Sequence, residues 1–443
     1  MLIVGLLLPS ASPRQWNPAK LAALYFLILI ANLILVKFLW FVFASLSRNF
    51  VASPFNDERL FFFALPFAFG GMLITLLAGD RIAPLFLFLY CPLAAQVTGA
   101  GFQDFLYIVV ANLIGIVVVC KARQRMAIIS AGFKLSTSAT ALVIAVQLAQ
   151  QAPLTLVTGA FGAGLAFLSG PITAGLLTFS LPLCERLFLV TTEIRLSELG
   201  NHNLPLLRQL MLRAPGTYNH SIAVGTLAEG AASAIGLSPL FVRVACLYHD
   251  VGKSIRPQFF IENQSNGVNP HDKLSPQESV RIIKEHVTEG IRMSRAAKLP
   301  ATIIDVIPQH HGTKRLSYFY DKAKQLASSD VAAASEEDFR YPGPKPQTKE
   351  AAVIMLADAL EAATRTLPEH SQERLLAMIQ KIVSTTTADG QLAECDLTLS
   401  EIDRITFSFL DTLSSFYHSR IVYPGFDFGK KAADNGRESS RAM

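Results

Sequence analysis

Charge and histidine are both scarce in the first part of this 443-residue chain. Residues 1–190 contain 11 lysines and arginines, five acidic residues and no histidine, whereas the whole chain contains 39, 34 and nine. Only 16% of all residues are charged, against about a quarter in ordinary soluble domains. With 51% hydrophobic residues and so regional a shortage of charge, the chain is neither intrinsically disordered nor a free soluble enzyme.

Cysteine is sparse as well. The five cysteines are scattered without a C-x-x-C spacing, which excludes a disulfide scaffold and any zinc or redox motif built from cysteine. Free thiols are consistent with a reducing, cytosolic location for the second part of the chain. Residues 191–443 hold 28 basic and 29 acidic side chains, so they offer no basic field for a nucleic-acid polymer.

Long apolar runs fill the first 190 residues. A helix needs about 20 apolar residues to cross the hydrocarbon core of a bilayer, and five runs of about that length are bounded by charge, glycine or proline. A sixth tract contains Pro171 and Pro182 and is long enough to cross once or twice. We expect six crossings, with the sixth tract crossing once. The runs are Leu21–Leu46, Leu60–Gly79, Ile82–Gly101, Phe105–Cys120, Ala127–Leu148 and Leu154–Val190.

The distribution of lysine and arginine predicts the orientation of these crossings. Short cytoplasmic loops carry an excess of basic residues, and the most basic loop is KARQR at Lys121–Arg125. Placing that loop in the cytoplasm puts both ends of the chain there as well. We therefore expect a multi-pass protein of the lipid bilayer, with residues 1–190 as the membrane domain and the second part in the cytoplasm.

The sequence pattern of residues 191–443 predicts helices. Charges return at helical spacing over residues 191–212, which we interpret as a helical linker, and residues 213–425 show no convincing strand pattern. Ser275-Pro276-Gln277-Glu278 has the pattern of a capping box that opens a helix. Two long loops, at residues 256–274 and 327–347, are expected to be functional or mobile. Residues 426–443 are expected to form a disordered tail.

Histidines and carboxylates recur along these helices in a sparse set. Neutral imidazoles with a few carboxylates suit iron, manganese, zinc or cobalt better than magnesium or calcium. Five imidazoles and two carboxylates exceed what one tetrahedral site uses, whereas two metals about 3.5–4 Å apart that share a carboxylate would use all of them, and such pairs act on phosphate esters. The candidate residues are His220, His249, Asp250, His286, His310, His311 and Asp358.

The order H…HD…H…HH…D and its surrounding sequence resemble a known family. The segments RAPGTYNHS, YHDVGK, RPQFFIENQ, NPHDKLSP, QHHGT and FRYPGPKPQTKEAA look like those of the seven-transmembrane HD-domain family of bacterial cyclic-di-AMP phosphodiesterases. The resemblance implies an all-α protein, in which a polytopic helical membrane domain precedes an α-helical HD phosphohydrolase. It also implies two divalent transition-metal ions, iron or manganese, and a place in the bacterial inner membrane with the HD domain in the cytoplasm.

The resemblance also implies roles for individual residues. One metal would be held by His220, His249, Asp250 and Asp358, and the other by His286, His310, His311 and the bridging Asp250. Lys253 would face the phosphate of the substrate. The candidates for holding the nucleotide are Arg340, Tyr341, Lys345, Asn269 and Lys273.

One feature departs from the family. Its members usually carry a large extracytoplasmic domain before the membrane helices, and an additional helix before that domain makes the seventh crossing. Here only about 20 residues precede the first apolar run. We expect that helix and domain to be absent, which agrees with the six crossings that the charge pattern favours.

The expected reaction is hydrolysis of cyclic-di-AMP to the linear dinucleotide pApA. Hydrolysis of cyclic-di-GMP by the related HD-GYP proteins is an alternative, but it calls for G-Y-P soon after the histidine pair, where this sequence reads HHGTKRLSYFYDKA. A non-catalytic cyclic-dinucleotide receptor is a second alternative, and such receptors typically lose metal ligands. A transporter would show internal repeats, and the sequence has none that we recognise.

Overall fold

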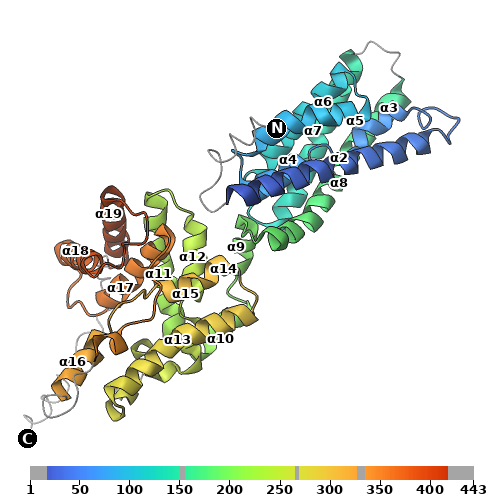
Figure 1. Ribbon diagram of the computed structural model, residues 1–443. Coiled ribbons are helices and arrows are strands. Elements are labelled where there is room, and N and C mark those ends of the chain that lie inside the picture. Colours follow the sequence, from blue (N-terminus) through green and yellow to red (C-terminus); the bar gives the residue numbers. More distant parts are fainter. Residues whose placement is uncertain (1–16, 150–154, 265–268, 327–334, 418–443) are drawn as a thin grey trace, which may run out of the picture. The chain divides into compact units, whose positions relative to one another are not determined.

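Helices are the only regular elements in the residues that the structure describes. This computed structural model describes residues 17–149, 155–264, 269–326 and 335–417, and no β-strand occurs in those ranges (Figure 1). The predicted all-α class is therefore confirmed. The chain divides into two units, Met1–Arg213 with Glu289–Asp305, and Ala214–Thr288 with Val306–Met443. The predicted domain boundaries stay predictions, and the tail expected at 426–443 lies outside the described residues.

Apolar helices build the first unit. Four stretches, α2, α6, α7 and α8, are individually long and apolar enough to cross a membrane, and so is the combined stretch Glu58–Ala78. α5, with 16 residues, is shorter. Each corresponds to one of the six predicted runs. The helices are α2 (Pro18–Ser47), α3 (Glu58–Phe61), η1 (Phe62–Ala64), α4 (Phe69–Ala78), α5 (Ala83–Thr98), α6 (Phe102–Val119), α7 (Arg125–Ala149) and α8 (Leu156–Phe188).

Prolines act differently in two of these stretches. The residue before a proline is pushed towards extended backbone, and Leu65, before Pro66, has ψ 134° and ends η1. The run Leu60–Gly79 is therefore interrupted, which its apolar pattern did not indicate. By contrast, α8 continues through Pro171 and Pro182 for 33 residues. The tract that we expected to cross once is a single helix.

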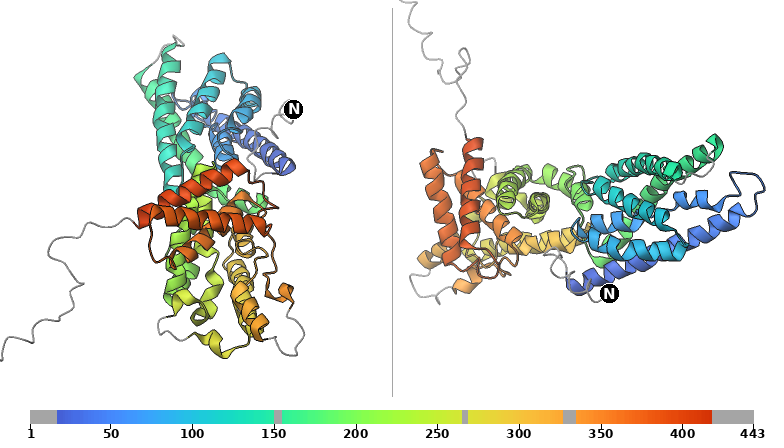
Figure 2. Two further views of the ribbon diagram at one scale, coloured as in Figure 1. Left: turned by 90° about the vertical axis from the view of Figure 1, so that its left-hand side faces the viewer. Right: turned by 90° about the horizontal axis from the view of Figure 1, so that it is seen from above.

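α7 and α8 lie side by side over much of their length (Figures 1 and 2). A β-carbon on Gly170 would lie 2.2 Å from the carbonyl oxygen of Gly132, so only glycine allows the two backbones to approach this closely. Ser136 donates a hydrogen bond across the same interface to the carbonyl oxygen of Phe167 at 2.7 Å. Small residues and an interhelical hydrogen bond thus hold this pair together.

A short polar helix follows α8 in the same unit. α9 (Glu193–Leu199) begins at Thr192, whose side chain caps the amide of Arg195. Arg123 forms an ion pair with Glu193 at 3.0 Å, and Arg125 forms another with Glu198. The start of α7 and the polar helix after α8 are therefore joined by two ion pairs. α10 (Pro205–Arg213) and α14 (Ala301–Ile304) complete the described helices of this unit.

The second unit is built around α11. This helix packs against α12, α17 and α19, and α18 packs beside both α17 and α19 (Figures 1 and 2). The α-helices are α11 (Pro215–Ala234), α12 (Pro239–Tyr248), α13 (Pro276–Ala296, which begins here), α15 (Val306–Gln309), α16 (Ser317–Leu326), α17 (Lys349–Thr364), α18 (Gln372–Ala388) and α19 (Leu399–Phe416). The 3-10 turns are η2 (Val251–Ile255), η3 (Pro257–Phe259), η4 (Ile261–Asn263), η5 (Pro270–Lys273) and η6 (Glu336–Phe339).

α17 is almost entirely buried. Eight of its apolar residues have no exposed surface, so this helix forms the centre of the core. Burial fixes its rotation and therefore the direction of the few polar side chains that it carries. Those fully buried residues are Ala351, Ala352, Val353, Ile354, Met355, Leu356, Ala357 and Leu360.

Candidate metal centre

Four of the predicted ligands from three parts of the unit converge in one group. His220 comes from α11, His249 and Asp250 follow the end of α12, and Asp358 comes from α17. One donor atom of each lies within 4.8 Å of the other three. His220 Nε2 is 2.9 Å from Asp358 Oδ1, and His249 Nε2 is 3.2 Å from Asp250 Oδ2.

A second group shares Asp250 with the first. His286 comes from α13, and His310 and His311 follow α15. These three and Asp250 again offer donor atoms within 4.8 Å of one another. His286 Nε2 is 3.4 Å from Asp250 Oδ1, and 3.2 Å from His311 Nε2. The two oxygens of Asp250 thus face different groups, Oδ2 towards the first and Oδ1 towards the second.

The donor atoms fit divalent transition-metal ions. Two ligand atoms that each lie about 2.1 Å from one ion are about 3.0–3.4 Å apart at octahedral or tetrahedral angles. The Nε2 atoms of His249 and His310 are buried and have no hydrogen-bond partner among the described residues. Buried nitrogens without partners are costly unless a cation takes their lone pairs. The residues present therefore suit a metal centre.

The backbone fixes which ring nitrogen each histidine presents. Nδ1 of His249, of His286 and of His310 each lies 2.5–2.7 Å from the carbonyl oxygen three residues earlier. A carbonyl oxygen only accepts, so Nδ1 carries the proton and Nε2 presents its lone pair to the centre. Helical spacing alone provides this orientation, because residue i−3 lies directly below residue i on a helix.

Glu361 orients the fourth histidine, and the sequence did not single it out. Its Oε2 lies 2.5 Å from His220 Nδ1, and its other oxygen accepts hydrogen bonds from Arg365. Glu361 lies three residues after Asp358 on α17, so both carboxylates face the same way. The i, i+3 spacing in the segment DALE was the available signal.

Charge at the centre favours a cation. Burial lowers the pKa of His286 to about 4 and of His310 to about 3, so both rings are neutral at neutral pH, the form that binds metals. Burial also acts to lower the pKa of His249, but the carboxylate of Asp250 outweighs it and raises the pKa to about 10. A metal ion would replace the proton that these carboxylates attract.

Lys253 reaches the centre from η2. Its Nζ lies 2.6 Å from Asp250 Oδ2 and 3.1 Å from Glu262 Oε1. Burial alone would lower the pKa of Lys253, yet the charge of Asp250 raises it overall, so the side chain is a cation. Glu262 also accepts a hydrogen bond from the hydroxyl of Thr217 at 2.8 Å. The expected contact of Lys253 with a phosphate stays a prediction.

Close packing requires a glycine at position 216, in the segment RAPGTYNHS that contains His220. A β-carbon at this position would lie 1.8 Å from the carbonyl oxygen of Glu262, so no side chain fits between the start of α11 and η4. This close approach brings Glu262 next to Thr217 and Lys253. The sequence predicted the importance of the segment but not this reason for its glycine.

Arg340 and Tyr341, two of the five predicted nucleotide contacts, make side-chain contacts within the protein. Tyr341 is buried and stacks on His311, with ring centroids 4.2 Å apart and an interplanar angle of 19°. Arg340 forms ion pairs with Glu336 at 2.8 Å and Asp389 at 3.1 Å. Tyr341 thus lies at the metal centre, whereas the guanidinium of Arg340 is held by two carboxylates.

The other three contacts lie on two loops. Lys345 lies near Gly312, the turn that follows the histidine pair, and its Nζ approaches Gly390. Asn269 caps η5 by accepting a hydrogen bond from the amide of His271, and Lys273 is an exposed residue of the same turn. Contact of these three residues with a nucleotide stays a prediction.

Comparison with known proteins gives the family of the chain. A family model described as a 7TM receptor with intracellular HD hydrolase matches residues 1–192, and the HD-domain model matches residues 217–363. The cyclic-di-AMP phosphodiesterase PgpH of Bacillus subtilis is 39% identical over 82% of this chain and 51% of its own length. The chain belongs to the 7TM-HD family. The PgpH protein of Listeria monocytogenes is also 39% identical, over 82% of this chain and 50% of its own.

The 7TM-HD chain spans about half the length of the curated relatives it matches. Two crystal structures show the HD domain of Listeria monocytogenes PgpH, one of them in complex with cyclic-di-AMP, and the sequence of that domain is 45% identical to this chain. They cover 49% of this chain and all of the solved chains, with TM-scores of 0.46 and 0.47. The match to the 7TM model and the apolar helices of the described residues make the chain a membrane protein, and the HD domain with its histidine and aspartate cluster implies binding of divalent metal.

Proposed function

We propose that the protein is a membrane-anchored, metal-dependent phosphodiesterase that hydrolyses cyclic-di-AMP to linear pApA. The observation that carries the proposal is the pair of donor groups that share Asp250. Two metal ions joined by one carboxylate form the type of centre that cleaves phosphate esters. The relatives support this substrate, because both PgpH proteins that match most of this chain are named cyclic-di-AMP phosphodiesterases.

The proposed ligands are the two converging groups. His220, His249, Asp250 and Asp358 would hold one ion, and His286, His310, His311 and Asp250 the other, with iron or manganese as the ions. When bound, such ions lower the pKa of a water molecule and neutralise phosphate oxygens.

The remaining residues of the centre hold these groups in place. Lys253 fixes Oδ2 of Asp250 and brings a buried positive charge to the position where we propose that the phosphate binds. Tyr341 covers His311 and excludes water from that side of the centre. Glu361 keeps the ring of His220 in the orientation that turns Nε2 towards Asp358 and the proposed metal ion.

We propose that the nucleotide contacts come from the loops beside the centre. Tyr341 stacks on His311, and Lys345 lies near Gly312, the residue after the histidine pair. Asn269 caps η5, and Lys273 is its last residue. Arg340 would have to exchange Glu336 or Asp389 for the ligand, so we expect its substitution to affect folding before substrate binding. The proposed location is the bacterial inner membrane, with the HD domain in the cytoplasm.

The proposed product is pApA. Opening one phosphodiester leaves a terminal phosphate and removes the closed shape that holds the second phosphate in a fixed place. The added charge and freedom of the linear molecule weaken its binding to a site shaped for the ring. We expect the full-length protein in detergent, supplied with Mn²⁺ or Fe²⁺, to accumulate pApA, while AMP appears slowly or not at all. Chromatography of samples taken over time measures both products.

The same assay includes cyclic-di-GMP and the variant Asp250→Ala. Prompt, stoichiometric AMP or faster cleavage of cyclic-di-GMP would contradict the substrate assignment while leaving the metal centre in place. Binding of cyclic-di-AMP without hydrolysis, at any metal content, would favour a receptor instead.

A further inference from the structure

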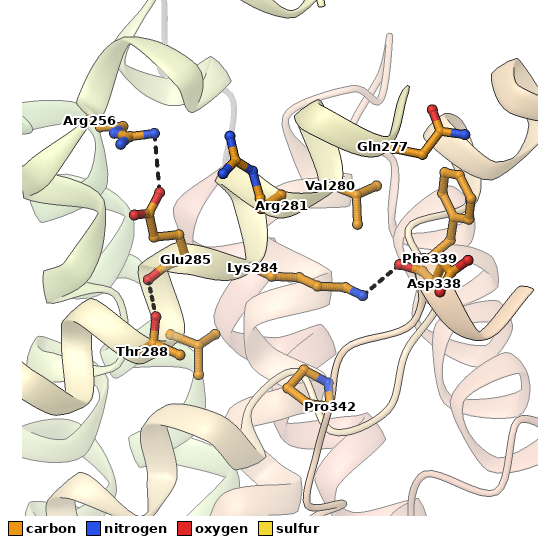
Figure 3. A pocket seen from close by; sticks show the side chains of 11 residues that line it. Arg256, Gln277, Val280, Arg281, Lys284, Glu285, Thr288, Asp338, Phe339 and Pro342 are labelled. Atoms are coloured by element: carbon orange, nitrogen blue, oxygen red, sulfur yellow. Dashed lines mark hydrogen bonds and ion pairs between the residues drawn. The ribbon is translucent and has the colours of Figure 1, made fainter. Parts of the chain in front are cut away.

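A cavity of about 570 Å³ lies along α13 (Figure 3). Successive residues of a helix are rotated by 100°, so Lys284 and His286 point to nearly opposite sides of α13. His286 faces Asp250, whereas Lys284 lines the cavity. Val280 from α13 and Pro342 from the loop after η6 form an apolar part of its wall. A space of this size accommodates a nucleotide-sized molecule.

Three cationic side chains line this cavity. Arg256 forms an ion pair with Glu285 at 3.1 Å, and both side chains stay more than 40% exposed. Lys284 donates a hydrogen bond to the backbone carbonyl of Asp338 at 2.7 Å (Figure 3). Arg281, one turn before Lys284, is exposed and makes no ion pair or hydrogen bond with any residue that the structure describes. Of these three cations, only Arg256 forms an ion pair, and that pair is exposed, whereas Lys284 bonds a backbone carbonyl oxygen and Arg281 forms no ion pair with the described residues.

We propose that this cavity is a second ligand site, for a small molecule that carries a terminal phosphate. A phosphomonoester carries a charge of about −1.5 to −2 at neutral pH, against −1 for each phosphate of a diester. Three cations and the two carboxylates of Glu285 and Asp338 leave a net positive charge in the lining, which suits the more highly charged group. The apolar wall at Val280 and Pro342 suits an attached ring. This site is separate from the metal centre and does not rest on the proposed function.

The segment Asp338–Pro342 joins the cavity to the metal centre. Asp338, Phe339 and Pro342 line the cavity, and Tyr341 of the same segment stacks on His311. A phosphate that draws Lys284 away from the carbonyl of Asp338 removes one of the contacts that hold this segment. Occupancy of the cavity is therefore coupled to the position of Tyr341, and the coupling is reciprocal.

Calorimetric titration of the full-length protein in detergent tests the binding. The probes are AMP, adenosine and inorganic phosphate, in the presence of EDTA so that phosphate has no metal to bind. AMP is expected to bind saturably, and adenosine at least tenfold more weakly. Arg281→Ala is expected to weaken AMP binding roughly tenfold, because a hydrogen-bonded charge contact is lost. Since Arg281 makes no ion pair or hydrogen bond with the described residues, its removal leaves the fold intact.

Arg292→Ala is the matched control. Arg292 lies on the same helix, pairs with Glu289 and does not line the cavity, so the variant removes the same charge without touching the site. It is expected to bind AMP as the unmodified protein does. The proposal is overturned if AMP does not saturate, if Arg281→Ala binds AMP normally, or if Arg292→Ala weakens binding equally.

The coupling has its own readout, and this part rests on the proposed function. At saturating cyclic-di-AMP, AMP is expected to change kcat in the unmodified protein and to have no effect in Arg281→Ala. An unchanged kcat in both proteins, with AMP bound, would refute the coupling. Absence of turnover with every metal would refute the proposed function and leave the binding result standing.

Discussion

Asp250 is the residue on which the binuclear proposal depends, because its two oxygens face different donor groups. In Asp250→Ala we expect the loss of at least one metal ion per chain and of all turnover. The helices are expected to persist, because their packing around α11 and α17 is apolar. Metal analysis, cyclic-di-AMP hydrolysis and circular dichroism measure the three effects. The exposed Asp403→Ala serves as control, and near-normal metal content in Asp250→Ala would contradict the shared ligand.

Glu361 allows a finer test, since it contacts a proposed ligand but is not one. Glu361→Gln keeps the size of the side chain and removes the charge that holds Nδ1 of His220. Loss of such an orienting partner typically weakens metal affinity about 10–100-fold. Titration of metal into chelated protein measures the change. Glu350→Gln, on the same helix, should leave the affinity unaltered, and an equal loss there would show a general effect of charge.

At this scale the sequence predicted the convergence of histidine and aspartate well. His249-Asp250 and His310-His311 stand at helix ends in apolar surroundings, where uncompensated polar groups are costly, so a shared role could be predicted. Glu262 gave no such signal. It also accepts a hydrogen bond from Thr217, and that contact needs the close approach at Gly216 of two segments far apart in the sequence, which local spacing does not encode.

Among the helices, α17 and α19 are linked by an ion pair with a defined pH dependence. The hydrogen bond from Lys349, together with the amide of Thr398, lowers the pKa of Glu401 from 4.5 to about 2. The ionised carboxylate therefore stabilises the fold above pH 4.5, and this contribution is lost as the pH falls from 4.5 through about 2. Its side chain is only 12% exposed, so solvent screens the pair weakly.

We therefore expect Glu401→Gln to lower the melting temperature by about 2–4 °C at pH 7, since an N-terminal cap and a largely buried pair are weakened together. The difference from the unmodified protein should shrink at pH 4 and further at pH 3. Differential scanning fluorimetry measures it. Glu369→Gln, which breaks the exposed pair with Arg374, should change little at any pH. A difference that stays constant with pH would contradict this origin.

Helix boundaries were predictable where local chemistry decides them. Glu278 accepts from both the amide and the hydroxyl of Ser275, as the capping-box pattern predicted. The break at Leu65 was missed, because the apolar run continues through Pro66 and only the backbone preference before proline marks it. The opposite outcome in α8, where two prolines leave the helix continuous, shows that proline alone does not decide.

For the whole molecule, the division into an apolar and an ordinary globular part followed from charge alone. The same charges predict that both ends of the chain lie in the cytoplasm. Reporter fusions at residue 12 and at the C-terminus should both report a cytoplasmic location. A fusion in the loop between α2 and α3 is the control and should report the opposite side. An N-terminus outside the cytoplasm would mean an odd number of crossings.

The glycine contact between α7 and α8 has a mechanical consequence. The backbones of α7 and α8 are in such close contact at Gly132 and Gly170 that sliding of one helix along the other would cause a steric clash. The two helices are therefore expected to move together. The ion pairs of Arg123 with Glu193 and of Arg125 with Glu198 connect α9 to the start of α7. A tilt of α7 is therefore expected to carry α8 with it, whereas α9 follows only in part, because residues 190–192 before it are not helical and its ion pair with Arg123 is exposed.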